Sequence, residues 1–143
     1  MTSRSRDERG LSISVEAAVV LPVIVLFIGL LLTLARIVLA EQHVGSAAAA
    51  GARAASLERS VAVAHREAEV AVGSALAQRN VACRSTAVDA DAAGVARPLG
   101  AQATVTVSVT CAVELADVSL PFIPGTVEVT AQRSSPVDPL RGR

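Results

Sequence analysis

An uncharged apolar stretch at residues 17–35 constrains this chain more than any other feature. Its sequence, AAVVLPVIVLFIGLLLTLA, contains no ionisable side chain and lies near the N-terminus. As an α-helix it would be about 28 Å long, which matches the hydrocarbon core of a bilayer. A buried helix of a soluble domain rarely needs so long a run without a polar face. We therefore predict a transmembrane helix within residues 11–40.

The residues before this stretch predict its orientation. Residues 1–10, MTSRSRDERG, carry Arg4, Arg6 and Arg9, whereas the other flank carries Arg36 and later Arg53. The positive-inside rule counts basic residues near the span and largely ignores acidic ones. We expect residues 1–10 to be a cytoplasmic leader of a single-pass protein of the cell membrane. The C-terminal region would then be extracytoplasmic.

Composition argues against several classes of function. Lys+Arg and Asp+Glu both number 13, so the chain lacks the basic excess that nucleic-acid binding needs. His43 and His65 stand apart from each other and from any cysteine or carboxylate cluster, which argues against a metal site. No nucleophile elbow, HExxH or phosphate-binding loop is present in the sequence. We expect no enzyme activity, no cofactor and no small-molecule substrate.

Residues 41–80 read as an extracytoplasmic helical region. The segment is rich in alanine, the best helix former, although Gly45 and Gly51 favour a bend or close helix packing. Asn80 is a candidate for the end of the helix. The apolar residues after residue 57 fall at helical spacing: Val61, Ala64, Ala68, Val72 and Leu76.

The pattern then changes to period two, which predicts strands. Residues 103–113, ATVTVSVTCAV, alternate valine or cysteine with threonine or serine, and residues 126–132 alternate likewise. A weaker strand is predicted at 81–88, followed by a polar turn at 89–94. We expect an apolar turn at 120–125, a small antiparallel sheet region within 81–132 and a flexible tail at 133–143.

The predicted fold class is therefore α+β and pilin-like. A long N-terminal helix, transmembrane in its first half, precedes a small antiparallel sheet of about three strands. Cys83 and Cys111 fall on adjacent predicted strands, and outside the cytoplasm a disulfide between them is the natural expectation. It would close a loop of roughly 28 residues and add about 3–4 kcal/mol in the chain-entropy model. Two buried free thiols are the alternative.

Two polar or helix-breaking residues accompany the apolar stretch. Glu16 either faces the headgroups or, inside the bilayer, needs a cationic partner, because an unpaired ionisable group there costs about 2–3 kcal/mol or more. Pro22 leaves a backbone carbonyl without its helical donor and predicts a kink that neighbouring helices would compensate.

These residues together resemble the TadE-like family, the pseudopilins of tight-adherence (Tad/Flp) pilus systems. The resemblance rests on Arg9–Gly10, on VEAAVVLPVIVLFIGLLL from Val15 with its Leu21–Pro22 step, and on GARAA at residues 51–55. It implies a minor pseudopilin, a structural or assembly component of a pilus or secretion apparatus with a role in adhesion or secretion. Its partners would be the lipid bilayer, other pilins or pseudopilins, Tad assembly proteins and a prepilin peptidase.

The resemblance also implies cleavage after Gly10, which would make Leu11 the new N-terminus. In prepilins the fifth residue after the cut is a Glu that meets the amino terminus of a neighbouring subunit, whereas Glu16 is sixth after Gly10. The chain would then either remain uncleaved or be cut by a tolerant peptidase.

Two other functions are compatible with the sequence. Val38-Leu39-Ala40 fits a signal-peptidase site, and cleavage there would release a secreted soluble protein that begins at Glu41. Alternatively, the helix is a plain single-pass anchor for an extracytoplasmic binding domain. The mature N-terminus distinguishes the three functions.

Overall fold

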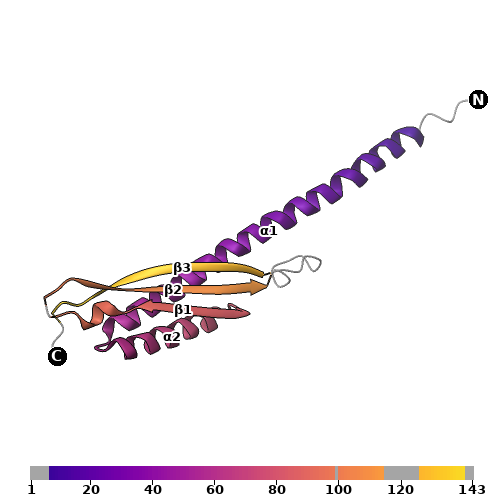
Figure 1. Ribbon diagram of the computed structural model, residues 1–143. Helices are drawn as coiled ribbons and strands as arrows, with labels where there is room; N and C mark the ends of the chain where they lie inside the picture. The colour runs from indigo at the N-terminus through magenta and orange to yellow at the C-terminus, as the bar shows by residue number, and fades with distance from the viewer. Residues whose placement is uncertain (1–6, 99, 115–125, 141–143) are drawn as a thin grey trace, which may run out of the picture.

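The computed structural model describes residues 7–98, 100–114 and 126–140, which form two α-helices, one short 3₁₀ helix and a three-stranded sheet (Figure 1). In chain order the elements are α1 (Asp7–Leu57), α2 (Val61–Gln78), β1 (Ser85–Asp91), η1 (Ala93–Ala96), β2 (Ala103–Glu114) and β3 (Thr126–Val137). The predicted α+β class, with a long N-terminal helix before a small antiparallel sheet, is confirmed.

Helix α1 is one continuous element of 51 residues. It runs through Pro22, Gly45 and Gly51 without interruption, and its first half projects away from the remainder of the molecule (Figure 1). Its second half packs against α2, β2 and β3. The predicted transmembrane segment and the predicted helical region thus belong to the same helix as far as Leu57.

Helix α2 has a capping hydrogen bond at its start and a Schellman motif at its end. Ser60 is the N-cap, and its side chain accepts a hydrogen bond from the Val63 N–H at 3.3 Å. At the other end the Asn80 N–H donates to the Ala77 carbonyl and the Val81 N–H donates to the Leu76 carbonyl, both at 3.1 Å. Asn80 has a φ of 52°, so α2 ends in a Schellman motif whose C-cap is Arg79, one residue before the predicted Asn80.

The sheet has the order β1-β2-β3 and both pairings are antiparallel. The first strand lies later than predicted, at Ser85–Asp91 instead of 81–88, so it extends into the predicted turn at 89–94, and η1 begins at Ala93 near the end of that turn. The strand continues through Asp89 and Asp91 because these side chains are exposed and alternate with Val88 and Ala90 on the inner face.

Strand β3 is also longer than predicted. It continues to Val137, so the first part of the predicted tail at 133–143 is ordered strand. Arg133 to Val137 pair with Val107 to Ala103 of β2, and Pro136 is tolerated because β3 is an edge strand. The predicted turn at 120–125 lies outside the described residues.

Both helices cover the same face of the sheet, and the core lies between the two layers. The predicted inward residues of β2 are fully buried at Val105, Val107, Val109 and Cys111. Alanines of α1 and α2 complete the core, and their small size lets the two helices lie close together and close to the sheet. Among the described side chains, which begin on α1 at residue 17, the fully buried core residues lie between Val44 and Val137, so none of those described on the projecting half of α1 belongs to the core.

Candidate membrane and assembly helix

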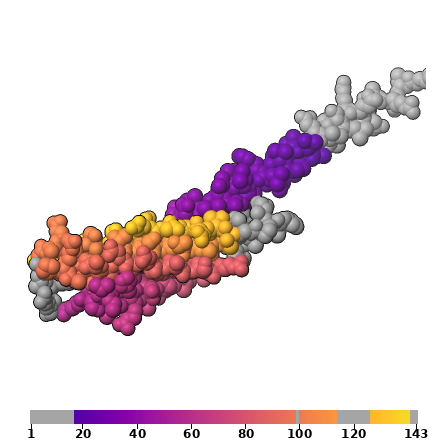
Figure 2. All heavy atoms as spheres, viewed as in Figure 1, coloured from indigo at the N-terminus to yellow at the C-terminus, as the bar shows by residue number. Residues whose placement is uncertain are grey.

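The projecting half of α1 exposes large apolar side chains on every side. Leu26 is 69% exposed and Val20 is 48% exposed, and the consecutive residues Leu30, Leu31 and Leu32 are all exposed. Because three consecutive helical positions cover most of the helix circumference, no face of this segment is covered by the described remainder of the chain. Figure 2 shows this segment standing clear of the folded part. An apolar surface of this extent marks a lipid or protein interaction site.

The polar groups of this segment are compatible with hydrocarbon. Residues 17–35 include no charged side chain, and the Thr33 hydroxyl donates to the Gly29 carbonyl at 2.8 Å. A hydroxyl bonded to the carbonyl four residues earlier leaves no donor that requires water. Among the described residues, α1 is one helix that is long and apolar enough to cross a membrane. It can therefore serve as a membrane anchor.

The four residues predicted for processing and assembly all lie on α1. Gly10 and Leu11 are in its first two turns, and Glu16 immediately precedes the exposed apolar run that contains Pro22. All four positions precede, along α1, the part of the helix that packs into the core, which begins at Val44 among the described side chains. Cleavage after Gly10 and pairing of Glu16 remain predictions.

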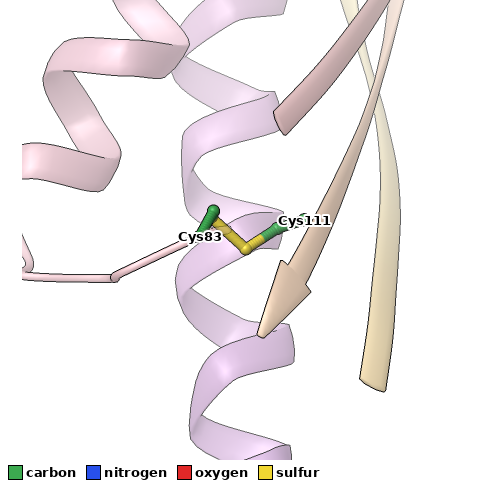
Figure 3. The surroundings of a disulfide bond; sticks show 2 residues. All are labelled: Cys83 and Cys111. Atoms are coloured by element: carbon green, nitrogen blue, oxygen red, sulfur yellow. A yellow bond between two sulfur atoms is a disulfide. The ribbon is translucent and has the colours of Figure 1, made fainter. Parts of the chain in front are cut away.

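The predicted disulfide is present between Cys83 and Cys111 (Figure 3). The two Cα atoms are 5.4 Å apart, within the range that a disulfide spans. Cys111 is fully buried on β2, as expected, whereas Cys83 lies in the segment between α2 and β1 and not on a strand. The bond therefore joins the segment that follows α2 to β2, the central strand of the sheet.

One polar contact in the folded part was not predicted. Ser56 is a buried polar residue near the end of α1, and its hydroxyl lies 3.1 Å from the Ser135 hydroxyl of β3. The Ser56 hydroxyl also donates to the Arg53 carbonyl at 2.8 Å. No pattern in the sequence predicts this contact, because residue 135 lies in the segment 133–143 that composition marks as a tail.

Residues 12–53 of the chain match a family model described as TadE-like protein. No curated protein and no solved structure matches the chain. The matched segment begins one residue after Leu11, includes Glu16 and Pro22, and continues along α1 to Arg53 in the folded part. The resemblance inferred from the sequence is thereby confirmed, and over residues 12–53 this chain is similar to the TadE-like family.

Proposed function

We propose that this protein is a minor pseudopilin of a Tad-type pilus or secretion apparatus and acts by helix–helix assembly, not by catalysis. The observation that carries the proposal is the uncovered apolar half of α1, which lies within the segment that matches TadE-like proteins. This helix would hold the chain in the membrane and pack against the helices of other pilins or pseudopilins. The folded part would take its place in the assembly outside the cytoplasm.

The proposed orientation has an N-terminus in the cytoplasm and a folded part outside it. Arg4, Arg6 and Arg9 precede the span and support this orientation by the positive-inside rule. The Cys83–Cys111 disulfide supports it independently, because such bonds persist in extracytoplasmic compartments and are rare in the cytosol.

Glu16 would set the position of each helix within the assembly. Its carboxylate directly precedes the uncharged run. Inside the bilayer an unpaired charge at this position would cost about 2–3 kcal/mol. A free amino terminus at Leu11 of a neighbouring subunit would offset this cost by pairing with the carboxylate. Processing by a prepilin peptidase after Gly10 would create that amine.

Co-purification from the native host tests this function. The full chain, extracted from membranes in mild detergent, should retain other pilins or Tad assembly proteins, identified by mass spectrometry. Glu16→Ala should lose most of these partners, whereas Glu128→Ala, which removes an exposed carboxylate from β3, should retain them. Equal recovery with Glu16→Ala would contradict the role of Glu16, and absence of such partners from the wild-type chain would contradict the function.

A second candidate is a secreted protein released by cleavage after Ala40. One observation favours it: among the described side chains of α1 the first that is fully buried is Val44, so this cleavage would leave the described buried core intact. A signal sequence also satisfies the length and composition criteria that α1 meets. The mature N-terminus distinguishes the two candidates.

A further inference from the structure

The face of the sheet that points away from the helices has no covering element among the described residues. We call it the outer sheet face, formed by the odd-numbered residues of β1 and the even-numbered residues of β2 and β3. Its centre consists of short hydroxyl side chains that bond to each other, as Thr106 does with Ser134 at 3.1 Å. At its described and exposed positions the charged side chains are Asp89, Asp91 and Glu128, and none is basic.

Arg53 lies on the opposite side of α1 from the core. Gly51, Ala52 and Ala55 are buried against α2 and the sheet, whereas Arg53 is exposed. Within the described ranges, no ion pair joins its guanidinium, or the carboxylates of Asp89 and Asp91, to another residue. Asp91 accepts only a backbone hydrogen bond, from the Ala93 N–H at 3.2 Å. These opposite charges therefore lie on different sides of the folded part and are available to other molecules.

Contacts across the core place these charges at the same level along the molecule. A Cβ atom at Gly51 would lie 3.4 Å from Val107 Cγ1. Val107 pairs with Ala90, the residue between Asp89 and Asp91. Arg53 is two residues beyond Gly51, a rise of about 3 Å along the helix. Arg53 and the two aspartates thus lie at nearly equal distances from the projecting half of α1.

We propose that Arg53 of one copy pairs with Asp89 and Asp91 of a neighbouring copy anchored in the same membrane. The inference rests on the membrane anchoring of the proposed function, because copies anchored by α1 share one orientation and one height. Residues at similar levels can then meet, and Arg53 and the two aspartates satisfy that condition with opposite charges.

This contact is heterologous, because the patch on one copy meets a different patch on the next. Such contacts do not close into a two-fold dimer, and they extend into rows or rings. Confinement to a membrane raises the effective concentration of the copies, so an exposed ion pair that is weak in solution contributes to association there. The occupant of the outer sheet face is thus a second copy of this chain.

Charge exchange between copies tests the pairing. The full chain would be reconstituted in lipid vesicles as donor- and acceptor-labelled copies, and energy transfer would be followed as the protein is diluted with lipid. Arg53→Glu alone, and Asp89→Arg with Asp91→Arg, should each weaken association by about fivefold or more, since both replace attraction by repulsion. An equimolar mixture of the two variants should restore association, because each contact then again joins opposite charges.

Arg79→Glu and Glu128→Arg are matched controls. Arg79 follows α2, and Glu128 pairs with Ala112 at the opposite end of the sheet from Asp91, so neither lies at the level of Arg53. Both variants should associate like the wild type. Unchanged association of the Arg53 and Asp variants, or no recovery in their mixture, would overturn the pairing. Wild-type copies that stay in the membrane without associating would overturn this inference alone, whereas copies that leave the membrane would also contradict the proposed function.

Discussion

Gly51 of α1 lies so close to Val72 of α2 that a Cβ atom at position 51 would stand 2.7 Å from Val72 Cγ2. The same atom would lie 3.2 Å from the Ala68 carbonyl oxygen, which belongs to a helix backbone and cannot move alone. The absence of a side chain at Gly51 therefore sets the distance between the two helices. This position carries the glycine of the GARAA element on which the resemblance to TadE-like proteins partly rests.

Alanine at position 51 should destabilise the folded part. Alanine favours a helix over glycine by about 1 kcal/mol, but overpacking a tight core typically costs about 1–3 kcal/mol. Gly73→Ala is the matched control, because its Cβ would meet nothing within 4 Å, and it should stabilise by up to about 1 kcal/mol. Thermal unfolding of a fragment comprising residues 41–143, which retains every residue that is fully buried among those described, would measure both. A higher melting temperature for Gly51→Ala would contradict the close packing.

Reduction of the Cys83–Cys111 bond should weaken the same fragment. The cysteines are 28 residues apart, and in the chain-entropy model a loop of that length contributes about 3–4 kcal/mol. Urea unfolding with and without a reductant would measure the loss as a lower midpoint. The variant with Cys83→Ala and Cys111→Ala should be equally weak and insensitive to the reductant. A wild-type midpoint that the reductant leaves unchanged would show that the bond does not stabilise the fold.

A charge in the middle of the apolar run should prevent membrane retention. Leu26→Arg places a guanidinium near the centre of residues 17–35, at a cost of about 2.5–3.5 kcal/mol for insertion. Leu57→Arg is the control, because Leu57 is also an exposed leucine, at 72%, but ends α1 in the folded part. Alkaline extraction of membranes should release more of the first variant and none of the second beyond the wild type. Equal retention of both would place residue 26 outside the hydrocarbon.

Much of this fold follows from the sequence because its signals are periodic. The alternation in residues 103–113 predicts the buried face of β2, and the helical spacing from Ala64 to Leu76 predicts the buried face of α2. The disulfide follows from the extracytoplasmic compartment expected for the two cysteines, although Cys83 lies just before β1 and not on a strand as predicted. In β2 and α2 the spacing of the apolar residues alone predicts both the type of element and the side chains that face the core.

The errors occurred where tertiary pairing overrides composition. Residues 133–137 contain Arg, two Ser and a Pro, a composition typical of a loop, yet they pair with β2 because the edge position tolerates Pro136. β1 lies later than the sequence predicts, because Asp89 and Asp91 are typical of a turn, whereas the exposed outer face of the strand accepts both acids. The level shared by Arg53 and the aspartates could not be predicted, because it depends on how α1 crosses the sheet.

The mature N-terminus and the cellular location of the protein from its own host would test whether it is a processed, membrane-anchored pseudopilin. We expect mass spectrometry to find residues 17–35 within the mature chain, in the membrane fraction, with Leu11 as the first residue. Recovery of a chain that begins at Glu41, in the soluble fraction or the medium, would contradict both the membrane anchor and the pseudopilin function.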